Sequence, residues 1–173
     1  MARSLEQVAG QIVQRWPGSE TLSLVGVYRR GVPFSERLAS LLIACGRNVE
    51  LGRVDITQYR DDLQAMAMVP KLEGSDIAFD VDDAVVILCD EVIYTGRTSR
   101  AALEELLDHG RPRCVQFAVL VDRPGRELPI QPDFVGLKLH NDDLRADQRV
   151  SVRFEESDGW DEVFVRNVPQ KAT

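Results

Sequence analysis

The sequence predicts an α/β fold in which a mainly parallel sheet is flanked by helices. Short apolar segments typical of strands alternate along the chain with segments of helical periodicity. One such strand, at residues 84–89, runs into two acids and a glycine turn, and a helical pattern follows directly. The length of 173 residues, with 44% hydrophobic and 28% charged residues, suits one domain with a real core. Such sheets bind ligands beyond the carboxyl ends of their strands, so we expect the functional site at that edge.

The N-terminal part alternates between helical and strand patterns. Leu5, Val8 and Ile12 recur at helical spacing before Pro17, which ends the first helix. The second helix lies between two apolar strand segments and has Gly46 as its C-cap. The expected elements are a helix over 4–16, a strand over 22–28, a helix over 32–45 and a strand over 49–55.

The C-terminal part begins after residues 56–75, which have no stable pattern. Gly110 closes the third predicted helix. Apolar residues alternate on both sides of a turn at 157–159, which predicts a small C-terminal β-hairpin. The expected elements are a strand over 84–89, a helix over 98–108, a strand over 115–121 and the hairpin over 149–165.

The turn at residues 90–98 carries the most specific chemistry. Asp90 and Glu91 can accept hydrogen bonds from two sugar hydroxyls, and Thr95 and Thr98 supply hydroxyl groups. Gly96 allows a close backbone approach to a phosphate, and the free N–H groups and dipole of the following helix favour an anion. The Walker-type phosphate loop is absent. The segment therefore predicts a site for a ribose that carries a 5′-phosphate.

This turn resembles the phosphoribosyl-pyrophosphate (PRPP) signature of type I phosphoribosyltransferases, with Glu91 where a second Asp is commoner. Other segments are similar to one branch of that family, the PyrR-type pyrimidine operon attenuators that double as uracil phosphoribosyltransferases. These segments are residues 24–32, 55–63, 74–80 and 120–130, and the similarity runs from about 22 to 136. The resemblance implies the type I phosphoribosyltransferase fold in a single domain over 1–173, with a small hood mainly at 122–136 and a flexible lid at about 64–78.

The resemblance also implies a reaction, in which uracil and PRPP give UMP and pyrophosphate, with Mg²⁺ carried by PRPP. It assigns Asp90, Glu91 and Arg30 to catalysis. The residues expected to bind PRPP and its phosphates are Tyr94, Thr95, Gly96, Arg97, Thr98, Arg29, Gly31, Asp55, Tyr59, Arg60 and Asp61. The residues expected at the base are Val121, Asp122, Arg123, Ile130 and Phe134. Residues 29–31, which follow a strand and carry two arginines, are called here the pyrophosphate loop.

Composition narrows the remaining possibilities. The three cysteines form no CxxC spacing and His109 and His140 stand apart, so we expect no metal held directly by Cys or His. The longest apolar runs are too short to span a bilayer, and we expect a cytoplasmic protein without a membrane partner. The expected partners are PRPP, uracil, UMP and, as the resemblance implies, further copies of the chain in a homodimer or larger assembly.

The chain departs from its relatives where those proteins bind RNA. The positions that differ from the family pattern are Glu6, Gln7, Gly10, Arg29, Gly125 and Gln131. These changes remove hydroxyl, histidine and arginine side chains of the family pattern, and the net charge is −7. We therefore expect weak or absent RNA binding and a loss of the attenuator role. The alternatives are a nucleotide-sensing RNA-binding regulator with little catalysis, or a phosphoribosyltransferase for another base.

Overall fold

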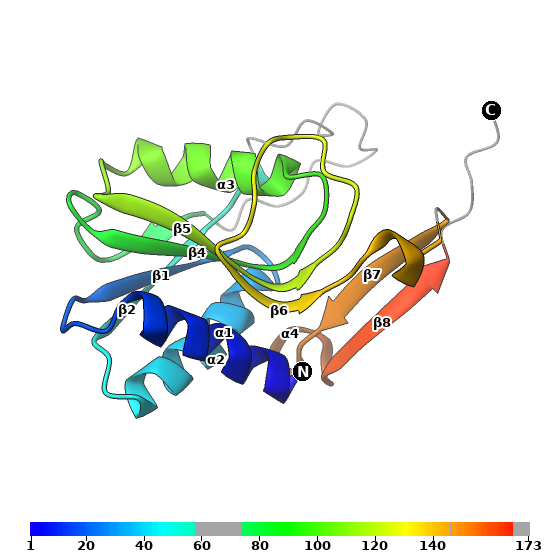
Figure 1. Ribbon diagram of the computed structural model, residues 1–173. Helices are drawn as coiled ribbons and strands as arrows, with labels where there is room; N and C mark the ends of the chain where they lie inside the picture. Colours follow the sequence, from blue (N-terminus) through cyan, green and yellow to red (C-terminus); the bar gives the residue numbers. More distant parts are fainter. Residues whose placement is uncertain (58–73, 146, 168–173) are drawn as a thin grey trace.

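A computed structural model describes residues 1–57, 74–145 and 147–167. Its centre is a six-stranded sheet in the order β3-β2-β1-β4-β5-β6, beside which β7 and β8 form a separate hairpin (Figure 1). The helices are α1 (Ala2–Arg15), α2 (Gly31–Ala44), α3 (Arg97–Asp108) and α4 (Glu155–Asp158), with a 3₁₀ turn, η3, at Asn141–Asp143. The strands are β1 (Leu22–Val27), β2 (Val49–Val54), β3 (Asp76–Ile77), β4 (Val85–Ile93), β5 (Cys114–Asp122), β6 (Phe134–Lys138), β7 (Gln148–Arg153) and β8 (Glu162–Asn167).

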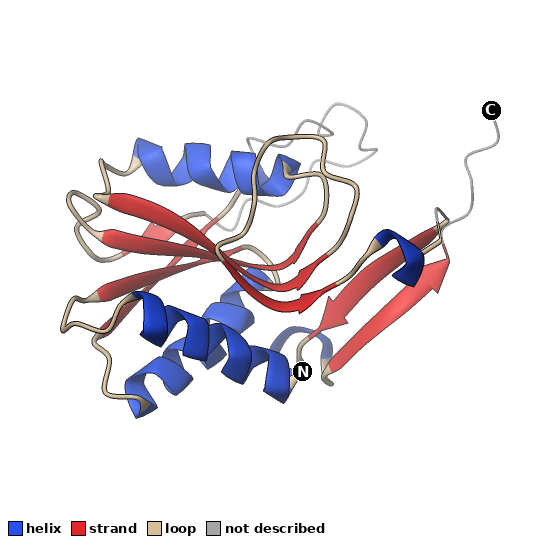
Figure 2. Cartoon of the chain, in the orientation of Figure 1, coloured by secondary structure: helices blue, strands red, loops and turns tan. Residues whose placement is uncertain are grey.

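The helices cover both faces of the sheet, which confirms the predicted α/β architecture. Helices α1 and α2 lie on one face and α3 on the other (Figure 2). The apolar side chains of β4 alternate between the two resulting cores: Val85 and Ile87 pack with α1 and α2, and Val86 and Leu88 pack with α3. Phe154, which follows β7, is fully buried in the first core and joins the hairpin to the body of the protein.

The topology brings two loops to one point at the edge of the sheet. Strands β2, β1, β4, β5 and β6 pair in parallel, and only β3 pairs antiparallel to its neighbour in this sheet, within the described residues. From β1 the chain moves outward to β2, whereas from β4 it moves the other way to β5 and β6. The strand order thus reverses between β1 and β4, and ligands in such sheets bind at this switch point. The pyrophosphate loop follows β1, and the acids Asp90 and Glu91 lie near the end of β4.

Several elements differ from the expected ones. Strand β4 extends to Ile93, past the predicted end at Cys89, because it stays paired with β5 through Ile93 and Asp122. Two short strands, β3 and β6, were not predicted, since each has few residues and β6 contains Gly136 and Lys138. The hairpin is present, but its connection holds the four-residue helix α4 before the glycine turn. None of the described helices is long and apolar enough to cross a membrane.

Candidate active site

The acid pair, Asp90 and Glu91, lies near the end of β4, at the switch point of the sheet. Asp90 is 5% exposed and its Oδ1 accepts a hydrogen bond from the Glu91 backbone N–H at 2.9 Å. Burial raises the pKa of Asp90 well above its ordinary value, and the charge of Glu91 raises it further. Groups that donate hydrogen bonds or carry positive charge would stabilise these carboxylates. A sugar with two hydroxyls, or a Mg²⁺-bound phosphate ester, meets that requirement.

The pyrophosphate loop packs directly onto the strand that carries the acids. A Cβ atom at Gly31 would collide with the carbonyl oxygen of Cys89 and lie 3.3 Å from Asp90 Cα. The Tyr28–Arg29 peptide bond just before it is cis. Hydrogen bonds to Asp158 raise the pKa of the Arg30 guanidinium, and the negative charge of Glu91 contributes to the same shift. Arg30, Gly31 and the acid pair therefore lie together, as the strand order requires.

The residues predicted to bind the 5′-phosphate, 94–98, lie at the N-terminus of helix α3. Gly96 is its N-cap with φ +91°, a conformation that favours glycine. The Thr95 side chain accepts a hydrogen bond from the Arg97 N–H at 3.3 Å, and Arg97 and Thr98 are exposed. The next N–H groups of this 12-residue helix point out of its N-terminus, where the helix dipole favours an anion.

The hood (residues 122–136) braces these residues from the other side. The backbone N–H groups of Glu127 and Leu128 both donate to the Thr95 carbonyl, at 3.0 Å each. Arg97 Nε pairs with Glu127 Oε2 at 2.8 Å. A Cβ at Gly96 would lie 3.4 Å from Leu128 Cβ, so the glycine sits directly beneath the hood.

Tyr94 and the arginines of the hood form a stacked group. The Arg123 guanidinium lies 3.8 Å from the centre of the Tyr94 ring, and burial lowers the pKa of Arg123. A side chain at Gly125 would collide with the same ring, so Tyr94 fills the space above the glycine. Arg126 donates to the Tyr94 carbonyl and, at 2.5 Å, to Asp122 Oδ1. Both arginines are thus engaged by the protein itself.

A pocket opens between the hood and the end of β6. Its lining residues are Asp122, Arg123, Pro124, Gly125, Arg126, Gln131, Lys138, Leu139, His140 and Asn141. Asp122 and Arg123, two of the predicted base-binding residues, line it. Val121 and Phe134 lie in the core formed with α1 and α2, and Ile130 packs toward the α3 core. The residues that the sequence did not predict here are 138–141, at the end of β6 and just after it. Recognising that strand would have placed them at this edge.

Of the remaining residues predicted to bind PRPP, the structure describes only Asp55. Asp55 follows β2, is 7% exposed and accepts a hydrogen bond from the Thr57 N–H at 2.9 Å. It also accepts one from the Gly74 N–H at 3.3 Å, which joins the two described ends of the intervening segment. Tyr59, Arg60 and Asp61, and most of the expected lid, lie outside the described residues.

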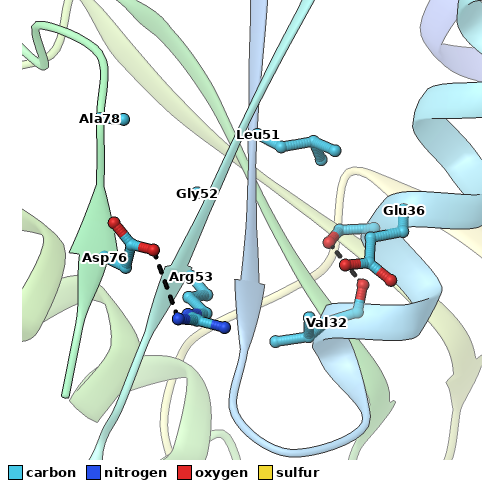
Figure 3. A pocket seen from close by; sticks show the side chains of 8 residues that line it. Val32, Glu36, Leu51, Gly52, Arg53, Asp76 and Ala78 are labelled. Atoms are coloured by element: carbon cyan, nitrogen blue, oxygen red, sulfur yellow. Dashed lines mark hydrogen bonds and ion pairs between the residues drawn. The ribbon is translucent and has the colours of Figure 1, made fainter. Parts of the chain in front are cut away.

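A second pocket lies at the other side of the pyrophosphate loop, between α2, β2 and β3 (Figure 3). Two of its lining residues, Arg53 and Asp76, form an ion pair at 3.3 Å, and Val32 borders it beside the start of α2. Its described lining residues are Val32, Ser35, Glu36, Leu51, Gly52, Arg53, Asp76 and Ala78, which include none of the predicted site residues.

Comparison with known proteins agrees with this geometry. The family model described as phosphoribosyl transferase domain matches residues 1–154. The hypoxanthine phosphoribosyltransferase of Trypanosoma cruzi has the same fold, with a TM-score of 0.64 at 22% identity over 80% of this chain and 76% of that one. A hypoxanthine-guanine phosphoribosyltransferase from Bacillus anthracis gives a TM-score of 0.63 at 20% identity, over 79% of this chain and 77% of that one.

Curated relatives give a closer match. A protein named Bifunctional protein PyrR from Pelotomaculum thermopropionicum is 47% identical over 164 residues, 94% of this chain and 89% of the relative. The protein of the same name from Deinococcus radiodurans is 48% identical over 160 residues, 92% of this chain and 86% of the relative. Given these similarities, the fold and the PRPP-type turn, this chain belongs to the phosphoribosyltransferase family and, within it, to the PyrR-type proteins.

Proposed function

We propose that this phosphoribosyltransferase uses uracil and PRPP, and releases UMP and pyrophosphate. The observation that supports the proposal is the meeting of three parts at one sheet edge. Gly31 brings the pyrophosphate loop against the acid pair, and Gly96 turns the chain from that strand into the N-terminus of α3. Pyrophosphate, ribose and 5′-phosphate each have a matching group within this arrangement.

The roles follow from the chemistry of each group. Asp90 and Glu91 hold the ribose hydroxyls and stabilise the positive charge that develops at C1 in the transition state. Arg30, with Arg29 and Gly31, binds the departing pyrophosphate through charge-assisted hydrogen bonds. Thr95, Gly96, Arg97, Thr98 and the N-terminus of α3 bind the 5′-phosphate, with Tyr94 above them. Mg²⁺, when bound with PRPP, neutralises part of the pyrophosphate charge, and the neighbouring carboxylate oxygens suit it.

The base would lie in the pocket under the hood. Asp122 and Arg123 supply polar groups there, and residues 138–141 form its opposite wall. Val121, Ile130 and Phe134, the other residues expected at the base, do not line this pocket: the first and last pack with α1 and α2, and Ile130 packs toward α3. This small pocket is lined mainly by polar and charged residues, whose groups can hydrogen-bond the edge of a small planar ring such as uracil.

A turnover assay tests this assignment. The chain should be stabilised against heat by PRPP with Mg²⁺, since ligands that bind the native state raise its melting temperature. It should then form UMP from uracil faster than it forms nucleotides from hypoxanthine or orotate. Preference for either of the other bases would contradict the uracil assignment while leaving the transferase intact. We also expect a cytoplasmic homodimer or larger assembly, which light scattering measures for the purified protein.

We further predict weak or absent binding to pyrimidine-operon leader RNA. The side chain of Gln7, at one of the altered positions, donates to the Val135 carbonyl at 3.3 Å, and Arg126 is engaged by Asp122 and Tyr94. The net charge of −7 offers no overall attraction for RNA phosphates that would compensate for these lost contacts. A mobility-shift assay near physiological salt, with UMP present and a scrambled hairpin as control, should show no specific complex. Tight, UMP-dependent binding to the leader hairpin would restore the regulatory alternative.

A further inference from the structure

Ion pairs with two arginines join the connection of the C-terminal hairpin to helix α2. This connection, residues 154–161, is called here the α4 turn. Asp158 of the turn pairs with Arg30, at the start of α2, and Glu156 and Asp161 both pair with Arg37, two turns further along the helix. The turn thus contacts one arginine of the pyrophosphate loop and one arginine outside the candidate site.

The Arg30–Asp158 contact has the geometry of a fixed, two-point pair. Arg30 Nε donates to Asp158 Oδ2 at 3.0 Å, and Nη2 donates to Oδ1 at 2.8 Å. Hydrogen bonds from Arg30 lower the pKa of Asp158 to about 2, so the pair stays ionised at neutral pH. Two parallel bonds fix the plane of a guanidinium, which a single bond cannot do.

Asp158 is itself anchored to the core. Its Oδ2 also accepts the backbone N–H of Phe154 at 3.2 Å, and the Phe154 side chain is fully buried. The orientation of Arg30 is therefore set by the packed base of the hairpin rather than by the pyrophosphate loop alone. Nη1 of Arg30 makes no hydrogen bond to any residue that the structure describes. The charge of Glu91 contributes to the raised pKa of Arg30, so the guanidinium lies near the acid pair.

We infer that Asp158 is a positioning residue for the transfer reaction, which holds Arg30 with its Nη1 edge ready for the pyrophosphate oxygens. The inference rests on the proposed function, because it takes Arg30 as a pyrophosphate ligand. A long arginine side chain loses much rotamer freedom when it is fixed. By fixing Arg30 before PRPP arrives, the pair removes that cost from the binding step.

The chain offers a matched pair of variants for the test. In Asp158→Asn, the amide oxygen can still accept the Phe154 N–H, but the amide NH₂ then faces an Arg30 donor and the two-point pair is lost. In Asp161→Asn, the same change removes a carboxylate from Arg37 and keeps an acceptor for the Glu155 N–H, with Arg30 untouched. Both variants loosen the α4 turn, and only the first alters the pyrophosphate loop.

Calorimetric titration with Mg²⁺–PRPP and with Mg²⁺–pyrophosphate measures the affinity of each variant for these ligands, whichever base the enzyme uses. We expect Asp158→Asn to weaken PRPP binding and raise the KM for PRPP by about tenfold, with a smaller change in kcat, because a contact is misplaced rather than removed. Asp161→Asn should stay within about twofold of wild type in both quantities. The two variants should have similar melting temperatures.

A double-variant cycle shows whether Asp158 acts through Arg30. Asp158→Asn combined with Arg30→Ala should bind PRPP no more weakly than Arg30→Ala alone. The inference would be overturned if the two Asn variants lost PRPP affinity equally, or if the losses from Asp158→Asn and Arg30→Ala were additive. Tighter PRPP binding by Asp158→Asn would also overturn it. Wild-type protein that fails to bind PRPP would instead overturn the proposed function, and the inference with it.

Discussion

Replacing Asp90 by Asn together with Glu91 by Gln should lower turnover roughly 10²–10³-fold, the size typical of a lost electrostatic contribution to the transition state. Both changes preserve shape, so the proposed ribose site stays open, but the positive charge expected at C1 loses the two carboxylates assigned to stabilise it. Initial rates of UMP formation at saturating PRPP measure the loss. Glu6→Gln, which removes a charge from the exposed face of α1, serves as the control and should keep the wild-type rate.

Removing the charge of Asp90 in this double variant should also make the free protein more stable than wild type. Asp90 has a raised pKa because its carboxylate is buried beside Glu91, so ionising it costs folding free energy. A folded-state pKa above the unfolded one means that stability is highest below about pH 4 for this group and falls as the pH rises toward the folded pKa. The Asp90→Asn change removes this dependence of stability on pH. The melting temperature of the double variant should therefore exceed that of wild type at pH 7, and the difference should shrink as the solution is acidified.

Activity that survives in the double variant would contradict the role assigned to the acid pair. A double variant that is both inactive and less stable would point instead to a structural role for these carboxylates. Activity and stability that move in opposite directions are the result expected of a site that keeps a buried charge for function.

The fold could be predicted because its signals are local. Helical spacing in α1 and the continuous apolar run of β4 each specify an element without reference to distant residues. The alternation of these elements then leaves few topologies, and a parallel sheet brings the pyrophosphate loop and the acid pair to the same edge. The turn at 90–98 could be interpreted for the same reason, since its chemistry lies in consecutive residues.

Other features depend on contacts between segments that the sequence does not join. Strand β6 is short and gains its place by pairing with β5, so residues 138–141, at its end and just after it, were missed as a wall of the hood pocket. Val121 and Phe134 are apolar residues close to the hood, and only packing shows that they face the core. The pairing of Arg30 with Asp158 joins residues 128 positions apart, and no local pattern predicts it.

Among glycine-to-alanine changes in the described part of the site, we expect Gly31→Ala to lower activity most. The added Cβ would meet the Cys89 carbonyl oxygen and lie 3.3 Å from Asp90 Cα, and both are backbone atoms in a central strand. The pyrophosphate loop must then move away from the acid pair. A shift of about 1 Å can cost about 10²-fold in rate, so we expect a loss of that order in UMP formation. Overpacking should also lower the free energy of unfolding by about 1–3 kcal/mol, measured by urea denaturation.

Gly10→Ala is the matched control, because it adds the same methyl group to a helix where nothing lies within 4 Å of the new Cβ. There the better helix propensity of alanine should raise stability by up to about 1 kcal/mol and leave turnover unchanged. The two glycines thus separate the general effect of alanine in a helix from the specific clash beneath the pyrophosphate loop. If Gly31→Ala behaves like Gly10→Ala, the loop does not depend on contact with β4, and its assigned position against Asp90 and Glu91 is wrong. If Gly31→Ala loses stability but keeps its rate, the contact holds the fold together without setting the geometry for catalysis.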